Sequence, residues 1–257
     1  MYAGLDVGSR TIKLVILDNA IKDSLIIESG ANPLRRCQEI LSGRRFERLV
    51  VTGYGRHLVA PILHGIVVSE VKAFAIGSRH LFNDCNTVID IGGQDAKVIL
   101  LSDLGEVRKF EMNDRCAAGT GKFLEVMAQT LGVGISEIGS LALGANKKIR
   151  INSLCTVFAE SEVVSLIARG EEASDIAMAL HEAIAIRIVT MACRVGVKKR
   201  VIFAGGAALN RCLHQLIKEK INLDLEVPPE PQMIGAIGAA ILAKKTLPDN
   251  NAVKETK

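Results

Sequence analysis

The stretch "NTVIDIGGQDAKVILL" (86–101) joins two apolar runs through a glycine turn, and Asp90 stands just before the glycines. A short buried strand, a tight turn and a second apolar strand are typical of a β-hairpin. The N-terminal stretch "YAGLDVGSRTIKLVILD" (2–18) repeats the pattern, with Asp6 in the place of Asp90. This repetition predicts two similar α/β halves.

Each hairpin is followed by further segments of the same kinds. Additional strands are expected at 24–29, 48–53, 105–112 and 200–206, and helices at 33–42, from 54 onward, and at 68–82, 119–131, 156–169, 173–195, 208–220 and 232–245. We place the first half at 1–85, with its C-terminal helix crossing over, and the second half at 86–257.

Composition excludes several classes of protein. The 257 residues are 49% hydrophobic and lack Trp, and this mass of Val, Ile, Leu and Ala suits buried strands covered by helices. The net charge of +4 is scattered, so we expect no nucleic-acid partner. No signal-peptide pattern opens the chain, and the closest candidate for a membrane span, "MIGAIGAAILA" (233–243), is too short. We therefore expect a cytoplasmic protein with no membrane partner.

The two glycine turns, "DVGSRT" (6–11) and "DIGGQD" (90–95), have the composition of phosphate-binding turns. Glycine lets backbone N–H groups approach phosphate oxygens without a Cβ in the way. Ser9 and Thr11 add hydroxyl donors and Lys13 a positive charge, whereas we expect Arg10 to face solvent. Asp6 and Asp90 would lie near the phosphates and need a cation there, most simply Mg²⁺.

A third strand–glycine–helix junction, "AGGAALN" (204–210), suits an adenosine or α-phosphate at a helix N-terminus. Two rival loops are excluded. "CAAGTGKF" (116–123) has Cys116 where a Walker A loop needs Gly and Phe123 where it needs Ser or Thr. No G-x-G-x-x-G follows a strand, so the dinucleotide fingerprint is missing.

Together these turns resemble the actin-like ATPase superfamily of sugar kinases, heat-shock chaperones and actin. The resemblance implies an α/β fold of the actin-like (ribonuclease H-like) type, with two similar halves around a nucleotide cleft. "VSEVKAFAIG" (68–77) resembles the first interdomain helix of that superfamily, in which a Glu, here Glu70, points toward the nucleotide. "PQMIGAIGAA" (231–240), with Gln232, resembles the second.

Two of the six cysteines, Cys116 and Cys155, stand just before expected helices, where the helix dipole favours thiolate. Two sulfurs are too few for a cubane iron–sulfur cluster, which takes four thiolates, but a symmetric dimer supplies four. The alternative is that they are small core residues, as we interpret Cys37, Cys85, Cys193 and Cys212. Spacing alone leaves both possibilities open for the first pair.

The motifs "GLDVGS", "TGYGR" (52–56), "DIGGQDAK", "MNDRCAAGTGKFLEVMA", "CTVFAESEVVSL" and "GGAALN" resemble the ATP-dependent activator (component A) of 2-hydroxyacyl-CoA dehydratases and the related ATPase subunits of benzoyl-CoA reductase, over essentially the whole chain. The resemblance implies a homodimer with one 4Fe-4S cluster bridged by Cys116 and Cys155 of both subunits. An electron from ferredoxin or flavodoxin would pass, driven by ATP, to a partner iron–sulfur dehydratase or reductase. Phe74 departs from the family, whose members often carry His in this stretch.

The candidate site residues fall into three groups. Those expected to act in ATP hydrolysis are Gln94, which would orient the attacking water, Asp6, Asp90 and Glu70. Those expected to contact ATP or ADP are Gly8, Ser9, Arg10, Thr11, Lys13, Gly92, Gly93, Gln94, Asp95, Gly119, Thr120, Gly121, Glu125, Gly205, Gly206, Asn210 and Gln232. The expected cluster ligands are Cys116 and Cys155.

Other functions remain open from the sequence. For an activator of this kind, the acceptor of the electron would be a dehydratase, an aryl-CoA reductase or a double-cubane cluster protein. A small-molecule kinase of the actin-like superfamily, without any cluster, is the main alternative of another class. A non-catalytic, nucleotide-dependent regulator is the third.

Overall fold

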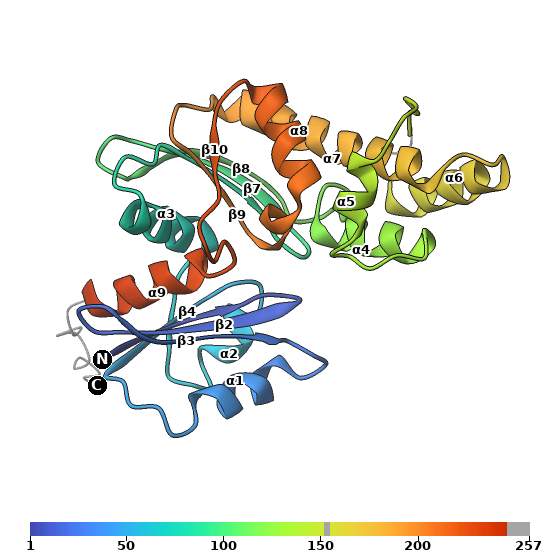
Figure 1. Ribbon diagram of the computed structural model, residues 1–257. Helices are drawn as coiled ribbons and strands as arrows, with labels where there is room; N and C mark the ends of the chain where they lie inside the picture. The colour runs from blue at the N-terminus through green and yellow to red at the C-terminus, as the bar shows by residue number, and fades with distance from the viewer. Residues whose placement is uncertain (152–154, 246–257) are drawn as a thin grey trace, which may run out of the picture. The chain divides into compact units, whose positions relative to one another are not determined.

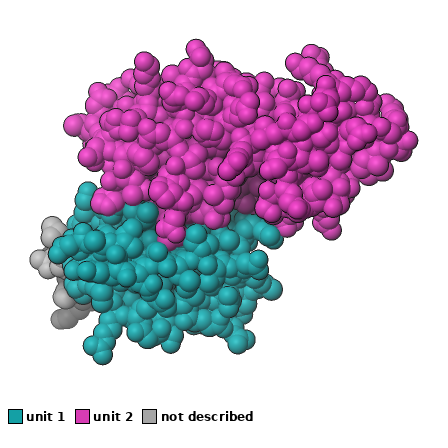
Figure 2. Space-filling model, viewed as in Figure 1, with its two compact units in different colours: residues 1–77, 235–257 teal, residues 78–234 magenta. Residues whose placement is uncertain are grey.

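The computed structural model describes residues 1–151 and 155–245. The chain forms two compact units, Met1–Gly77 with Gly235–Lys257, and Ser78–Ile234 (Figure 2). We call them unit 1 and unit 2. Each is built around its own five-stranded sheet.

Unit 1 has the strand order β3-β2-β1-β4-β5. Figure 1 labels β2, β3 and β4 of this sheet, together with α1 and α2. Strand β2 pairs antiparallel with both β1 and β3, β4 pairs parallel with β1, and β5 pairs parallel with β4. Its elements are β1 (Tyr2–Val7), β2 (Thr11–Leu17), β3 (Ile21–Glu28), α1 (Pro33–Leu41), β4 (Arg48–Thr52), α2 (Arg56–Val59), β5 (Ile66–Val67), most of α3 (Glu70–Leu81) and nearly all of α9 (Ile234–Lys245).

Unit 2 has the strand order β10-β9-β6-β7-β8, with the same antiparallel and parallel pairings. Its elements are β6 (Thr87–Ile91), β7 (Ala96–Leu101), β8 (Val107–Asn113), α4 (Gly121–Thr130), α5 (Ile138–Leu143), α6 (Thr156–Ala168), α7 (Ala173–Val195), β9 (Val201–Ala204), the 3₁₀ helix η1 (Gly206–Leu209), α8 (Arg211–Ile221) and β10 (Leu225–Glu226).

The two sheets repeat each other down to the register. Asp6 of β1 lies opposite Lys13 of β2, and Asp90 of β6 lies opposite Lys97 of β7. The pairing of the second and third strands shifts at corresponding places, after Ile16 and after Leu100. The expected duplication of strand, turn and strand is therefore confirmed, and it extends to the whole sheet.

The expected boundaries between the halves are wrong at two places, because residues 78–85 belong to unit 2 and the last helix, α9, belongs to unit 1 rather than to a half spanning 86–257. The small residues of α9 explain its place. A Cβ on Gly4 of β1 would lie 2.2 Å from the carbonyl oxygen of Ala236, so the backbones of β1 and α9 touch. Ala239 and Ala243 pack against Val50 of β4 in the same core. The chain thus returns to its first sheet at the end.

Helix α7 forms the centre of the unit 2 core through Ile176, Leu180, Ile184 and Ile188. By length and composition alone, α7 rather than 233–243 could cross a membrane, but 56% of its most apolar window is buried within the protein, as in the core helix of a soluble protein. Cys193, expected in the core, is exposed on α7 because the buried stripe of the helix lies on its other side.

Most expected elements are confirmed within one to four residues. The exceptions are short ones. The helix expected from residue 54 is the single turn α2, and α5, β5 and β10 were not expected. Helix α8 begins at Arg211 rather than at residue 208, because η1 occupies the preceding residues.

Candidate nucleotide site and cysteine loop

The first turn is closed by a hydrogen bond from the Gly8 N–H to the Thr11 carbonyl (3.1 Å). The buried Asp6 is the last residue but one of β1, and the Lys13 ammonium lies 3.2 Å from its Oδ2. A Cβ on Gly8 would lie 2.8 Å from the Thr11 oxygen, so glycine is needed for this close turn. Ser9, Thr11 and Lys13 are each partly accessible and Arg10 is exposed, as expected.

Backbone crowds around Asp6 from two other segments of unit 1. A Cβ on Gly53, which follows β4 with φ +90°, would lie 2.5 Å from Asp6 Oδ1. A Cβ on Gly235 of α9 would lie 3.1 Å from Asp6 Oδ2 and 3.0 Å from the Phe74 ring. The Phe74 ring is therefore packed beside the helix that covers Asp6.

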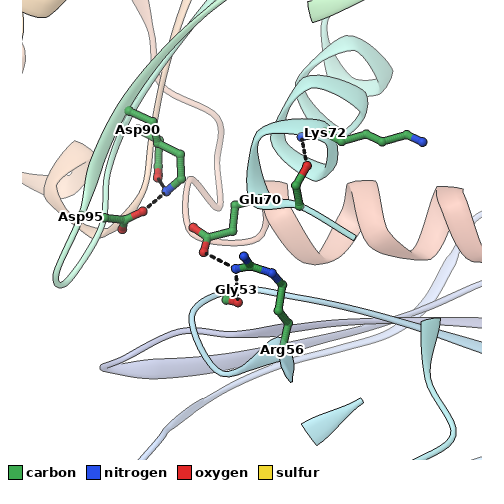
Figure 3. Close-up of polar contacts among 8 residues, drawn as sticks. Gly53, Arg56, Glu70, Lys72, Asp90 and Asp95 are labelled. Atoms are coloured by element: carbon green, nitrogen blue, oxygen red, sulfur yellow. Dashed lines mark hydrogen bonds and ion pairs between the residues drawn. The ribbon is translucent and has the colours of Figure 1, made fainter. Parts of the chain in front are cut away.

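Glu70 begins α3, and its carboxylate is paired within unit 1. The Arg56 guanidinium lies 3.4 Å from Glu70 Oε1 and donates to the Gly53 carbonyl at 3.0 Å (Figure 3). Arg56 was not among the expected site residues. Its place at the end of the "TGYGR" motif, directly after the glycines, was the signal that pointed to it.

The second turn is closed in the same way, from the Gly92 N–H to the Asp95 carbonyl (2.9 Å). The Lys97 ammonium lies 2.6 Å from Asp90 Oδ2 and 2.5 Å from Asp95 Oδ2 (Figure 3). Only 1% of the Lys97 side chain is exposed. Lys97 was missed from the sequence, although it follows Asp90 at the spacing at which Lys13 follows Asp6.

Asp6 and Asp90 were expected to need a cation, most simply Mg²⁺, and in the structure each has a lysine ammonium beside it. A buried carboxylate is stabilised by any close cation, so Lys13 and Lys97 supply positive charge that a metal ion was expected to supply. Gln94 lies exposed at the tip of the second turn, where its amide can reach a ligand.

The third glycine junction contacts the second turn within unit 2. Gly205, with φ +84°, donates to the Pro231 carbonyl at 2.9 Å, and a Cβ on it would lie 2.5 Å from Asp90 Oδ1. A Cβ on Gly206 would lie 3.3 Å from the Gln232 amide nitrogen. The fold therefore brings Gly205, Gly206, Gln232 and Asp90 together.

Asn210, expected as a nucleotide contact, is engaged inside unit 2. Its Oδ1 accepts the Leu213 N–H (3.0 Å) as the N-cap of α8, and its amide nitrogen lies 2.9 Å from His181 Nε2. The other ring nitrogen of His181 bonds the Ala177 carbonyl at 2.7 Å, and burial lowers the pKa of this histidine. The structure thus gives the Asn210 side chain a role in joining α7 to α8.

Cys116 does not stand at a helix N-terminus, and that expectation is wrong. It lies in a loop before α4, in which Asn113 donates to the Cys116 carbonyl (2.9 Å) and Gly119 has φ +87°. This turn delays the helix until Gly121. The hydroxyl of Thr120 is fully buried and donates to the Ala117 carbonyl (2.6 Å), while Glu125 pairs with Lys122 at 3.5 Å.

The start of α4 is bonded directly to the second turn. The N–H groups of Gly121 and Lys122 donate to the carbonyls of Gly92 and Gly93, each at 2.8 Å. No side chain caps this helix end, so the turn carbonyls satisfy N–H groups that a helix leaves open there. A Cβ on Gly121 would lie 3.0 Å from the Gly92 oxygen.

Cys155 is the N-cap residue of α6 and is exposed, as the sequence predicted for a thiol at a helix N-terminus. Cys116 is half-buried. In contrast, Cys37, Cys85 and Cys212 are core residues whose pKa burial raises to about 12. Among residues 1–151 and 155–245, no group of three or more His, Cys, Asp or Glu side chains forms a metal site.

Comparison with known proteins gives the family. The model of the BadF/BadG/BcrA/BcrD ATPase family matches residues 3–243. The chain belongs to this family. It is 40% identical to the 2-hydroxyisocaproyl-CoA dehydratase activator of Clostridioides difficile, with 95% of each chain covered.

Two solved structures superpose on the chain. Component A of the (R)-2-hydroxyglutaryl-CoA dehydratase of Acidaminococcus fermentans gives a TM-score of 0.87 at 37% identity, over 95% of this chain and 97% of that one. The activator of the 2-hydroxyisocaproyl-CoA dehydratase from Clostridium difficile with bound ADPNP gives 0.86 at 40% identity, over 95% and 94%. The resemblance and the actin-like ATPase fold expected from the motifs are confirmed.

Proposed function

We propose that this protein is an ATP-driven electron-transfer activator, which delivers single electrons to a 2-hydroxyacyl-CoA dehydratase. The relatives named as dehydratase activators support this assignment, because they match nearly the whole chain. Another relative, 28% identical, is named as one of the subunits of a benzoyl-CoA reductase, so an aryl-CoA reductase is the second candidate acceptor.

One observation carries the proposal. The carbonyls of Gly92 and Gly93, in the second glycine turn, accept the first N–H groups of α4, and the loop before α4 holds Cys116. Any ligand that moves the turn therefore moves the start of α4. An ATPase that uses nucleotide to control a redox centre needs such a connection between the two sites.

The nucleotide is held by the glycine turns in this proposal. Gly8 and Gly92 form tight turns, in which a Cβ would clash with Thr11 and Asp95 respectively. Such turns let backbone N–H groups face phosphate oxygens. Oxygen ligands suit Mg²⁺, and Asp90 and Asp95 carry carboxylates on either side of the second turn. Exposed Gln94 orients the attacking water.

Cys116 and Cys155 fit half of a 4Fe-4S site, because each chain supplies two of the four thiolates that such a cluster takes. Neither sulfur belongs to the fully buried set formed by Cys37, Cys85 and Cys212, so both are open to a ligand from outside the chain. We therefore propose a homodimer that shares one cluster, whose chemistry is to accept an electron from ferredoxin or flavodoxin and pass it on. A centre of this kind is suited to the cytoplasm of an anaerobic cell.

Anaerobic purification followed by native mass spectrometry and iron analysis tests the cluster. The proposal predicts a brown dimer with about four irons. Cys116→Ala and Cys155→Ala each lose the iron, whereas Cys193→Ala, which alters another exposed cysteine, keeps it. A colourless monomer that phosphorylates a small metabolite would instead identify a kinase.

A further inference from the structure

We propose that Lys97 is a positioning residue of the second turn, whose ammonium takes the place of a divalent cation between Asp90 and Asp95 while no nucleotide is bound. The inference rests on the proposed function, since it concerns the turn assigned to ATP. It assigns a role to a residue that the sequence motifs left unused.

Because the fold is duplicated, the second turn can be compared with the first, position by position. In unit 1, the Lys13 ammonium lies 3.2 Å from Asp6 Oδ2. Thr11 stands two residues before Lys13. In unit 2, the position of Thr11 is held by Asp95, so one lysine serves two carboxylates, at 2.6 and 2.5 Å. The second turn therefore has one carboxylate more than the first.

Burial strengthens the interaction between the Lys97 ammonium and the two carboxylates. The side chains of Lys97 and Asp90 are 1% and 2% exposed, and that of Asp95 is 19% exposed. Two carboxylates this close repel each other, and the ammonium that lies between them offsets this repulsion. A lysine supplies one positive charge on a flexible stem, whereas Mg²⁺ supplies two and prefers carboxylate oxygens.

The lysine also fixes the shape of the turn. Asp90 precedes the turn glycines and Asp95 follows them, so Lys97 ties the two ends together across Gly92 and Gly93. A Cβ on Gly92 would lie 2.6 Å from Asp95 Oδ1, which shows how closely this carboxylate covers the turn. The carbonyls that receive α4 are thereby held in place without any ligand.

The test measures thermal unfolding of the full chain in the absence of nucleotide, in EDTA and in millimolar Mg²⁺. Lys97→Met removes the ammonium that the buried Asp90 and the partly buried Asp95 share, so its midpoint in EDTA falls by about 10 °C. Mg²⁺ alone restores most of that loss, whereas the wild-type midpoint does not respond to Mg²⁺. Lys97→Met/Asp95→Asn, with one carboxylate fewer, loses the response.

Lys13→Met is the matched control, because Asp6 has no second carboxylate at the Thr11 position and Mg²⁺ should not restore its stability. A Lys97→Met chain that folds but ignores Mg²⁺ overturns the proposal, and so does one that remains unfolded with and without Mg²⁺. ADP binding by the wild type is measured separately. A wild type that binds no ADP contradicts the proposed function and leaves the Mg²⁺ response of the variants to be judged on its own.

Discussion

The Gly121 N–H lies 2.8 Å from the Gly92 carbonyl oxygen, so the first residue of α4 is bonded to the glycine turn assigned to nucleotide. The neighbouring Lys122 N–H makes the same bond to Gly93. Because the Cys116 loop leads directly into α4, a change in the turn reaches the cysteine without passing through any flexible side chain.

Gly121→Ala is expected to uncouple the turn from the cysteine loop. Its Cβ would lie 3.0 Å from the Gly92 oxygen and push the two apart. In the cluster-free wild type, ADP should change the rate at which iodoacetamide alkylates Cys116, and this dependence should be lost in Gly121→Ala. Mass spectrometry of tryptic peptides measures the rate.

Lys122→Gln is the control, since it changes a partly exposed side chain of α4 and leaves both backbone bonds in place. It should keep the nucleotide dependence. Equal dependence in Gly121→Ala and the wild type would show that these bonds do not connect the two sites.

Gly53→Ala and Gly205→Ala are expected to destabilise their units by similar amounts, because both glycines have positive φ and both would place a Cβ 2.5 Å from an aspartate oxygen. Gly43 and Gly170 also have positive φ but open space around them, so alanine there costs about 1 kcal/mol for the backbone alone. The crowded pair should cost about 2 kcal/mol more. Urea unfolding midpoints measure the difference, and equal costs at all four sites would refute the close approach.

His181 should make stability depend on pH. Burial lowers its pKa in the folded state below the ordinary 6.5, so the unfolded chain takes up a proton first as the pH falls. The folded state is therefore fully stable above pH 6.5 and loses stability below it, by at most about 1.4 kcal/mol per pH unit from this group. In His181→Gln, the difference in unfolding free energy between pH 7.5 and pH 5.5 should be smaller than in the wild type. A wild type and variant with parallel pH profiles would contradict this.

Thiol labelling should divide the six cysteines by burial in cluster-free protein. Cys155 and Cys193 are exposed and should react first with iodoacetamide at pH 8, followed by the half-buried Cys116. Cys37, Cys85 and Cys212 should stay unlabelled until the chain unfolds, since burial raises their pKa to about 12 and the thiolate is the reactive form. Early labelling of any of these three would contradict the described core.

The sequence predicted the hairpins well because their information is local. An Asp, a glycine turn and two apolar runs specify the strand, the turn and the face that is buried. The same pattern marked Asp6 and Asp90, whose places at the ends of β1 and β6 are confirmed.

The features that could not be predicted from the sequence depend on the local conformation of the chain or on contacts between distant segments. The apolar run of α9 does not show which sheet the helix covers, and its packing on Gly4 and Val50 places it in unit 1. The sequence suggested a helix directly after Cys116. The positive φ of Gly119, which turns the chain before α4 begins, could not be read from the sequence. The pairing of Asn210 with His181 joins separate helices and left no sequence signal.

The most direct test of the account is a single-turnover electron transfer from the pre-reduced, cluster-loaded dimer to a purified 2-hydroxyacyl-CoA dehydratase, followed by the loss of absorbance of the reduced cluster under anaerobic conditions. We predict that the electron moves when ATP and Mg²⁺ are added and stays in place with ADP or with no nucleotide. Transfer at the same rate in all three conditions, or none with ATP, would contradict the claim that nucleotide controls the redox centre.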